Sequence, residues 1–308
     1  MVDILLQTLP FFALIGLGFW SGATGFFSAE ATAYLTKFVF YFALSAMLFR
    51  FSANLSIGDI FDLNFVLAYL AASIAVYLLA TLVAVLRKRS MAEAAVEAQC
   101  AIIGNVGFLG IPMLVLLLGD KAIGAVLLVL ATDLIVFGSL IVILITASRG
   151  RMSPAIFGTV GLGLLKNPMI MSIAAGLIWS AFALPIPAPV NDFLQILGAA
   201  ATPGALFAIG ASLAGKSAER LSVAAWLSFC KLVLHPAAVA LSALVIFSVD
   251  PAQAGPMIAA AALPVAGNVF ILAQHYGVAP QRASAAILIS TIMSVLTVTA
   301  VVAWVGTL

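Results

Sequence analysis

Long apolar runs follow one another along almost the whole chain, and this pattern constrains the fold more than any other feature. A transmembrane helix needs about 20 residues, because it rises ~1.5 Å per residue across ~30 Å of hydrocarbon. Ten runs reach that length, and charged residues, proline and glycine gather in the breaks between them. The pattern predicts an all-α integral membrane protein with ten transmembrane helices, at residues 4–24, 31–50, 63–86, 93–118, 122–147, 161–183, 193–214, 221–247, 253–277 and 283–306.

The composition excludes several other classes of protein. Of the 308 residues, 65% are apolar and only 8% are charged, against about 25% charged residues in soluble globular domains. A soluble enzyme, a disordered chain and a nucleic-acid-binding protein are therefore excluded, and a β-barrel would show short alternating segments instead. The two cysteines and two histidines are too scattered to form a metal site, so we expect neither a metal nor a cofactor.

The basic residues predict how the chain is oriented in the membrane. Cytoplasmic loops are enriched in Lys and Arg, and ten basic residues lie in or beside the connections that follow odd-numbered helices. Only Arg50 and Lys121 lie on the opposite side. We therefore expect a multi-pass protein of the inner (plasma) membrane with both termini on the extracytoplasmic side. The ten residues are Lys37, Arg87, Lys88, Arg89, Arg149, Arg151, Lys166, Lys216, Arg220 and Arg282.

Short matches between the two halves of the chain predict an internal repeat. Most share an offset of 158 residues, and one has an offset of 163 residues. Because residues 1–150 and 151–308 each hold five predicted helices, the second half must be inverted relative to the first. Inverted repeats are typical of secondary transporters, which bind substrate near mid-membrane between the halves. The matched pairs are Pro10 with Pro168, Gly18 with Gly176, Leu48 with Leu206, Phe49 with Phe207, and Gly104-Asn105-Val106 with Gly267-Asn268-Val269.

The fourth and ninth predicted helices each contain a Gly-Asn-Val sequence and a proline, which predicts that both are broken near mid-membrane. Proline lacks an N–H and clashes with the carbonyl four residues earlier. A broken helix exposes N–H groups and the positive end of a helix dipole, and both favour an anion. Alternatively, the asparagines only form hydrogen bonds between neighbouring helices, and the prolines only bend the helices that contain them. The candidate substrate-binding residues are Gly104, Asn105, Gly107, Pro112, Pro264, Gly267 and Asn268.

Two charged residues lie near the centre of predicted helices. Asp133 and Lys231 are about 17 Å deep at ~1.5 Å per residue. A charge at mid-bilayer costs ~2.5–3.5 kcal/mol on insertion scales, so each is expected to be the other's partner. His235 lies one turn beyond Lys231 and could relay a proton. The three residues could couple transport to a proton, or Asp133 and Lys231 could form a static brace.

Polar residues also open and close the broken helices. Glu93, Glu97 and Gln99 open the fourth predicted helix, where the helix dipole favours acids. A solvated helix start is favoured there over a sodium site. Gln274 and His275 close the ninth predicted helix and are expected to lie at the membrane interface.

Several longer motifs resemble the auxin efflux carrier family. They are GNVGFLGIP, KNPMIMSIAAGLIW, TPGALFAIGASLAG, KLVLHP and LPVAGNVFILAQHYG, which start at residues 104, 166, 202, 231 and 263. The resemblance runs through essentially the whole chain. The bacterial branch of that family is associated with malonate and related organic acids, and the plant branch with auxin, which is also a carboxylic acid.

The resemblance implies a detailed architecture. The fourth and ninth helices would cross at their broken centres, at Asn105 to Pro112 and at Pro264 to Asn268. The first, second, sixth and seventh helices would form a scaffold, the other six a mobile transport unit, and two copies a homodimer. Lys231 matches a buried lysine that is frequent in the family's eighth helix. Ser45 stands where a proline is common, and the long cytoplasmic region of the plant carriers is missing.

Together these features predict a secondary transporter of the efflux carrier type. Its partners would be the lipid bilayer and a small organic anion, such as a carboxylate or dicarboxylate, which it would move by alternating access. A sodium-coupled symporter of the bile-acid-carrier type is the alternative, although the ninth predicted helix contains no acid. A membrane sensor and an intramembrane enzyme are less favoured, because neither an output domain nor a nucleophile with a base is evident.

Overall fold

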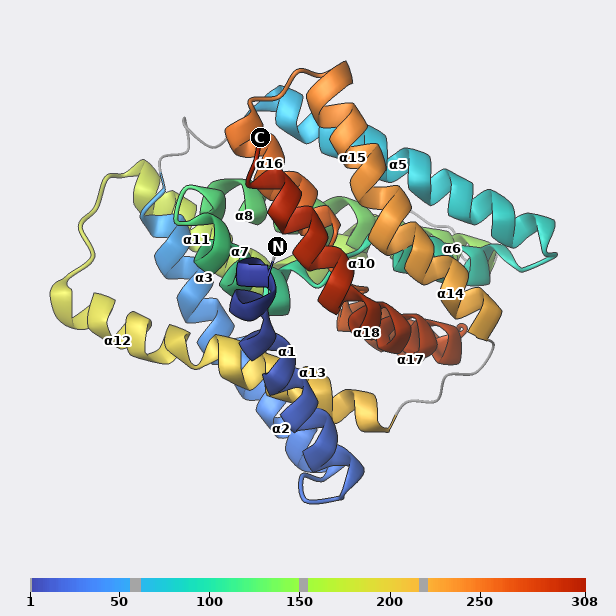
Figure 1. Cartoon of the computed structure of the whole chain (residues 1–308), viewed down its shortest axis with the longest axis horizontal. Coiled ribbons are helices and arrows are strands. Elements are labelled where there is room, and N and C mark those ends of the chain that lie inside the picture. The colour runs from blue at the N-terminus through green and yellow to red at the C-terminus, as the bar shows by residue number, and fades with distance from the viewer. Residues whose placement is uncertain (1, 56–61, 150–154, 216–220) are drawn as a thin grey trace.

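A computed structural model describes residues 2–55, 62–149, 155–215 and 221–308, and every regular element among them is a helix (Figure 1). Seven helical segments are long and apolar enough to cross a membrane, and a bent pair of helices would make an eighth. The predicted all-helical membrane fold is therefore confirmed for this part of the chain. The three basic residues Arg151, Lys216 and Arg220 lie outside the described residues.

The seven long segments coincide with seven of the predicted helices. Three are single helices: Leu6–Ala23 in α1 (Val2–Ala23), Leu63–Leu86, which is α5, and Pro280–Val305, which is α18. In the first half, Ala29–Ala53 consists of α2 (Ala29–Phe38), η1 (Val39–Ala43) and α3 (Leu44–Ala53), and Ala122–Ser148 consists of α8 (Ala122–Thr132), η3 (Asp133–Phe137) and α9 (Gly138–Ser148). In the second half, Ala188–Ala214 consists of α12 (Ala188–Ala199) and α13 (Ala201–Ala214), and Leu221–Ile246 consists of α14 (Leu221–Phe229), η4 (Cys230–Leu234), α15 (His235–Leu241) and η5 (Ser242–Ile246).

The other three predicted helices are interrupted. The fourth consists of α6 (Met91–Ile102), η2 (Val106–Gly110) and α7 (Ile111–Leu118), and the ninth of α16 (Pro251–Ala261) and α17 (Gly267–Tyr276). The sixth consists of α10 (Ala155–Leu165) and α11 (Pro168–Ala181), which meet at an angle of 68°. Because α6, α16 and α17 are too short to cross a bilayer alone, the number of ten crossings stays a prediction.

Local sequence signals explain where the interrupted helices begin. Ser90 and Glu93 form a reciprocal capping box at the start of α6, which satisfies N–H groups that a helix start leaves free. Asn167 caps α11 and Asp250 caps α16, and a proline follows each of them in the first turn. Proline is favoured at that position because its missing N–H has no helical partner anyway.

The helices pack in two groups. In the first, α1 packs on α13, and α3 packs on α11 and α12. In the second, α5 packs on α6, α14 on α18, and α8 on α16. Figure 1 shows the first group along the left and the bottom of the molecule and the second along the top and the right. The groups meet where α13 contacts η2 and α1 contacts α7 and α18.

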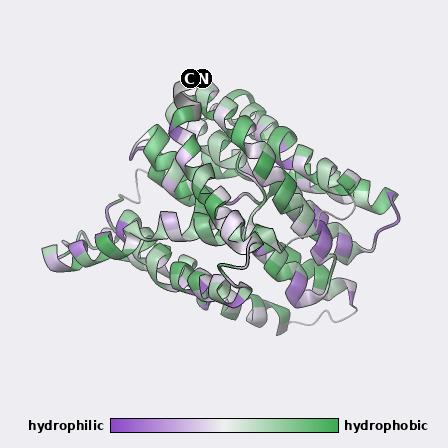
Figure 2. Ribbon diagram, turned by 60° about the horizontal axis from the view of Figure 1, so that its bottom comes forward, coloured by the Kyte–Doolittle hydropathy of each residue, from purple (hydrophilic) through white to green (hydrophobic). Residues whose placement is uncertain are grey.

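The outer surface of the helices is apolar, and Figure 2 shows hydrophobic residues along most of their length. Large apolar side chains such as Leu78, Leu82 and Leu86 of α5 are exposed, which suits a surface that faces lipid. Thr8 of α1 and Thr299 of α18 are joined by a hydrogen bond of 3.2 Å between their hydroxyls. The two ends of the chain therefore lie on the same side of the molecule.

Two glycine contacts in the first helix group are related by the predicted repeat. A Cβ on Gly18 of α1 would collide with the carbonyl oxygen of Phe207 in α13, and a Cβ on Gly176 of α11 would collide with the carbonyl oxygen of Phe49 in α3. Gly18 and Gly176 are 158 residues apart, and so are Phe49 and Phe207. The contact of Gly18 with Phe207 is therefore equivalent, under the predicted repeat, to the contact of Gly176 with Phe49.

Replacing either glycine by valine is expected to destabilise the protein by about 1–3 kcal/mol, because the added methyl groups would push two backbones apart. The check is the thermal unfolding midpoint of the purified variants. Gly16→Val is the matched control, since Gly16 is also in α1 but a Cβ there would meet nothing within 4 Å. Equal midpoints for Gly16→Val, Gly18→Val and Gly176→Val would contradict the close packing.

Candidate functional site

The two interrupted helices meet at their unwound segments. The N–H of Asn105 donates to the carbonyl of Pro264 at 2.8 Å, and the N–H of Ala266 donates to the carbonyl of Ile103 at 3.0 Å. Gly104 and Val265 thereby form an isolated antiparallel bridge, and the N–H of Val265 donates to the Ser290 hydroxyl at 3.0 Å. The two breaks therefore satisfy several of each other's backbone groups, which hydrocarbon could not do.

Pro112 does not mark the break as the sequence predicted. The chain unwinds at residues 103–105, and Pro112 lies beyond η2, in the first turn of α7. A π-helical turn precedes the proline, with the N–H of Ile111 bonded to the carbonyl of Val106. This wider turn changes which carbonyls need a donor, so the missing N–H of Pro112 does not end the helix. Pro264, by contrast, lies inside the unwound segment before α17.

The start of α17 has free hydrogen-bonding groups. The N–H groups of Gly267 and Asn268 make no hydrogen bond to a described residue, and no side chain caps this helix start. Gly267 is exposed, and a Cβ there would meet nothing within 4 Å. The Oδ1 atom of Asn268 is buried without a partner. The two free N–H donors, together with the helix dipole, make this helix start suitable for an anion.

The first repeat supplies a second helix start, where the N–H of Val106 is already bonded to the carbonyl of Gly104. Asn105 stands where η2 begins and is 6% exposed. Within the described part of the chain, its side-chain amide has no hydrogen-bond partner. Gly107 faces the first helix group, because a Cβ there would meet the terminal methyl group of Met169 in α11. The structure thus brings Gly104, Asn105 and Pro264 together, and Gly267 and Asn268 follow directly on the unwound segment.

Lys231 is fully buried beside the crossing. Its ammonium donates to the carbonyl of Ala261 at the end of α16 and lies 3.3 Å from Nδ1 of His235. A Cβ on Gly104 would lie 3.3 Å from the lysine Nζ, so the crossing approaches the charge closely. The end of a helix carries partial negative charge. The positive charge of Lys231 therefore compensates the partial negative charge of the carbonyl that the break in the ninth predicted helix leaves free.

Asp133 and Lys231 are not direct partners, contrary to the prediction. No ion pair within 4.0 Å joins them among the described residues. The Tyr69 hydroxyl donates to Oδ1 of Asp133 at 2.8 Å, and Oδ2 of Asp133 is buried without a partner. The ammonium of Lys231 instead binds the carbonyl end of α16 at Ala261, and the Tyr69 hydroxyl binds the carboxylate of Asp133.

Two residues of α5 complete this polar cluster, and the sequence reasoning missed them. The Ser73 hydroxyl lies 3.0 Å from Nε2 of His235, and the Tyr69 ring packs edge-on against the His235 ring at 5.8 Å. A chain of contacts thus runs from Lys231 through His235 to Ser73 and Tyr69. Tyr69, Ser73 and Tyr77 recur every four residues in an apolar helix, a spacing that places them on one helical face.

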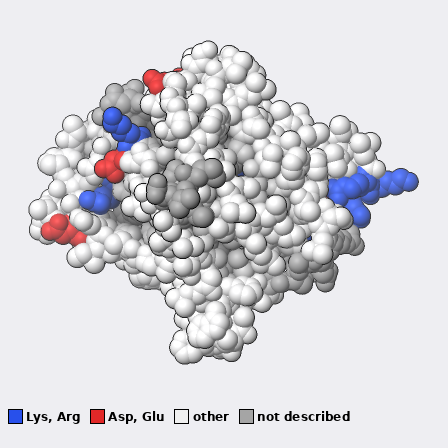
Figure 3. Space-filling view, in the orientation of Figure 1, with Lys and Arg blue, Asp and Glu red and all other residues white. Residues whose placement is uncertain are grey.

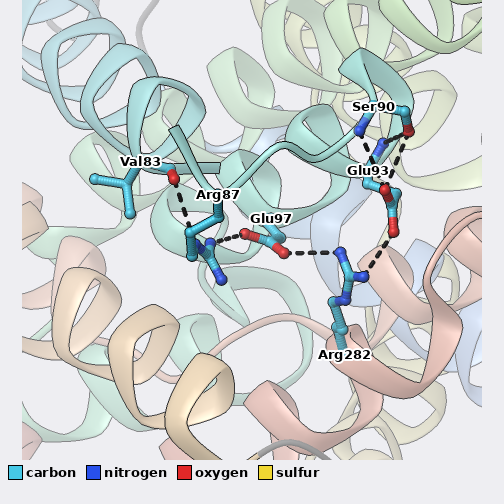
Figure 4. Close-up of polar contacts among 6 residues, drawn as sticks. All are labelled: Val83, Arg87, Ser90, Glu93, Glu97 and Arg282. Carbon is cyan, nitrogen blue, oxygen red and sulfur yellow. Dashed lines mark hydrogen bonds and ion pairs between the residues drawn. The ribbon is translucent and has the colours of Figure 1, made fainter. Parts of the chain in front are cut away.

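Glu97 belongs to a buried charge cluster and not to a solvated helix start, which corrects the prediction (Figure 4). Its carboxylate is fully buried and pairs with Arg87 and, at 2.9 Å, with Arg282. Arg282 also pairs with Glu93 at 2.6 Å. Gln99 is buried too and donates to the carbonyl of Phe137 at 3.2 Å. The sequence could not show this, because Arg282 comes from α18, 185 residues after Glu97.

Comparisons with known proteins decide the family. A family model described as membrane transport protein matches residues 3–302. The chain belongs to this membrane transport protein family. A protein of Rhizobium meliloti (strain 1021) named "Putative malonate transporter" is 32% identical over 306 residues, which cover 97% of this chain and 95% of that protein. "Uncharacterized transporter YfdV" of Escherichia coli (strain K12) is 28% identical over 296 residues, or 94% and 93% of the two chains.

The match confirms the resemblance to auxin efflux carriers, and the protein is a membrane transporter and not an enzyme. Within the described residues of the transporter, no group of three or more His, Cys, Asp or Glu could hold a metal ion. Gln274 and His275 are exposed near the end of α17. The buried polar side chains of the transporter are mostly Ser and Thr hydroxyls, with a few amides and charged groups.

Proposed function

We propose that the protein is a secondary transporter of the efflux carrier type, which moves a small carboxylate or dicarboxylate by alternating access. One observation carries the proposal. At the crossing, a helix start presents the N–H groups of Gly267 and Asn268, which have no hydrogen-bond partner among the described residues. Such groups bind a carboxylate, because backbone N–H groups and side-chain amides donate to its oxygens. Malonate is the first candidate, since one relative carries that name.

An inverted repeat of five plus five helices is part of this proposal. The exchanged contacts of Gly18 with Phe207 and of Gly176 with Phe49 support it. Two copies of one structural unit, related by a two-fold axis, would make each such contact twice. The two broken helices meet at Gly104 and Val265, in or just before a Gly-Asn-Val sequence, and this supports the repeat as well. Ten crossings would place both ends of the chain on one side, as the hydrogen bond between Thr8 and Thr299 does.

Alternating access would come from movement between the two helix groups. The group of α1, α2, α3 and α10 to α13 would be the scaffold, and it would also form the homodimer. The remaining helices, from both halves 1–150 and 151–308, would be the transport unit. The cluster of Arg87, Glu93, Glu97 and Arg282 ties α5 and α6 to α18, so this unit would move as one body.

Lys231, Asp133 and His235 would set the charge beside the anion. The ammonium of Lys231 lies next to Gly104 and would attract a carboxylate. The contact chain through His235, Ser73 and Tyr69 offers a route for a coupling proton. The basic residues of the connections would face the cytoplasm and both termini the outside of the plasma membrane. Figure 3 shows a cluster of basic residues at one edge, where α5 ends in Figure 1.

A thermal-shift screen of carboxylates tests the binding site. Malonate at about 100 times its dissociation constant should stabilise the purified protein by about 2.7 kcal/mol, because it binds only the folded state. Asn105→Ala and Asn268→Ala should each weaken this binding about tenfold while the protein stays folded. Asn64→Ala, which changes an exposed asparagine of α5, should bind malonate like the wild type.

Runs with and without sodium, at two pH values, would separate sodium coupling from proton coupling in the same screen. If no carboxylate raises the unfolding midpoint, the proposed substrate class is wrong. If a carboxylate binds but Asn105→Ala and Asn268→Ala both bind it with unchanged affinity, the site lies elsewhere.

A further inference from the structure

Two adjoining cavities lie between the two helix groups, and of the candidate substrate-binding residues only Pro112 lines them. One has a volume of about 420 Å³ and is lined by α3, α7, α12 and α13. The other, of about 830 Å³, is lined by the end of α3, the connection after α7 and the start of α12. Arg50, Phe51 and Asp120 line both cavities. Their sizes fall in the range of about 300–1,000 Å³ that ligand pockets have.

The cavities contain several charged residues, although only 8% of the residues in this chain are charged. Arg50 and Lys121 are the two basic residues that the sequence places opposite the other connections, and both line the larger cavity. Asp120 contributes one carboxylate. No ion pair within 4.0 Å joins Arg50, Lys121 or Asp120 to any other described residue. The two positive charges therefore remain available, and they exceed the negative charge of Asp120 by one.

Arg50 is held in a way that leaves its binding groups free. Its Nε donates to Oδ1 of Asn191 in α12 at 3.0 Å. Its two terminal nitrogens make no hydrogen bond to a described residue. A guanidinium binds a carboxylate through two parallel N–H···O bonds. Asn191 fixes one edge of the group, and the terminal nitrogens are left for a ligand in the cavity.

We propose that these cavities form a vestibule in which Arg50, with Lys121, binds a dicarboxylate on its way to or from the crossing. One carboxylate of the anion would bind the terminal nitrogens of Arg50, and the second would be attracted by Lys121. A cleft with an excess of positive charge raises the local concentration of anions, and Arg50 and Lys121 give the larger cavity such an excess over Asp120. The smaller cavity reaches Pro112 at the start of α7, and only η2 separates this residue from the unwound residues 103–105 along the chain.

The vestibule rests on the proposed transport function, and its position explains why capture would be reversible. Arg50 and Asn191 belong to the proposed scaffold, whereas Pro112, Asp120 and Lys121 belong to the proposed transport unit. Movement of one group against the other would change the distance between Arg50 and Lys121. The vestibule would then hold a dicarboxylate best in the conformation that is open on this side.

Uptake kinetics of radiolabelled malonate in proteoliposomes test the proposal. Arg50→Gln should raise the KM about tenfold with little change in Vmax, because capture weakens while the crossing is intact. Arg50→Lys should have an intermediate KM, since it keeps the positive charge but loses the two parallel N–H donors of the guanidinium. Lys121→Gln, an exposed change that leaves folding intact, should raise the KM about threefold. Lys88→Gln removes an exposed charge outside both cavities and should leave the KM unchanged.

A labelling experiment reports on the vestibule itself. Cys100 and Cys230 are both buried, so a cysteine introduced as Gln195→Cys in the smaller cavity should react selectively with a charged thiosulfonate reagent. Malonate should slow this reaction in the presence of Arg50 and should not slow it in Arg50→Gln. Protection that survives Arg50→Gln would overturn the proposal.

The outcomes separate the vestibule from the proposed function. If the wild type takes up malonate and Arg50→Gln has the same KM as Lys88→Gln, the vestibule proposal alone is wrong. A lowered Vmax with an unchanged KM in Arg50→Gln would also overturn it, because Arg50 would then act in the conformational change. If the wild type moves neither malonate nor any other carboxylate, the proposed function fails and the vestibule with it.

Discussion

Glu97→Ala is expected to lower the free energy of unfolding by about 3–5 kcal/mol, which is typical when one partner of a buried ion pair is removed. The carboxylate of Glu97 is fully buried between Arg87 and Arg282. Without it, Arg282, which is only 8% exposed, would keep Glu93 as its one described acidic partner. The variant should therefore unfold at least about 5 °C below the wild type, measured in detergent by the thermal midpoint.

Glu93→Ala is the matched control for this change. Glu93 lies one turn earlier in α6 and also pairs with Arg282, but its side chain is 29% exposed. Partly exposed ion pairs contribute about 0–1 kcal/mol and the lost capping contact with Ser90 costs about 0.5–2 kcal/mol, so its midpoint should fall less than that of Glu97→Ala. Equal midpoints for the wild type and Glu97→Ala would show that the cluster does not hold α5, α6 and α18 together.

Lys231→Met is expected to lower malonate uptake by about 10- to 100-fold, or about 1.4–2.7 kcal/mol. The variant keeps an unbranched side chain at a fully buried position but removes the ammonium beside Gly104 and Ala261. Replacing a buried charge by an apolar residue of similar volume is often neutral for stability. The thermal midpoint should therefore change little, which separates a role in transport from a static brace.

Lys37→Met provides the comparison for Lys231→Met, since Lys37 is an exposed lysine of α2. Its uptake should stay within about twofold of the wild type. A Lys231→Met protein that transports malonate like the wild type would exclude Lys231 from the mechanism. A folded fraction that collapses in parallel with uptake would instead support the brace.

The apolar runs predicted the all-helical membrane fold because a helix that crosses a bilayer must have about 20 residues, most of them apolar. Seven long helical segments fall within or close to predicted ranges. The positions of the breaks were harder to predict from prolines alone. Pro264 lies inside an unwound segment, whereas Pro112 follows a π-helical turn inside a continuous helix. Whether a freed carbonyl ends a helix depends on which neighbours can donate to it, and the sequence does not show those neighbours.

The candidate site was predictable in part. The paired Gly-Asn-Val sequences indicated the crossing, since the repeat predicts two equivalent breaks. The partners of the buried charges were not predictable, because they come from distant helices. Lys231 bonds the carbonyl of Ala261 and Asp133 accepts from Tyr69, although pairing by charge alone had joined Lys231 to Asp133. Glu97 shows the same limit, because its acidic neighbour and its position at a helix start both suggested a solvated residue.

Uptake of radiolabelled malonate into proteoliposomes tests most directly whether the chain moves a carboxylate through the crossing of its two broken helices. The wild type should show saturable uptake that excess unlabelled malonate abolishes, and protein-free vesicles should show none. The double variant Asn105→Ala/Asn268→Ala, if it elutes and unfolds like the wild type, should have lost nearly all of this uptake. Uptake by the double variant at the wild-type rate, or no uptake by the wild type of any carboxylate that stabilises it, would contradict the account.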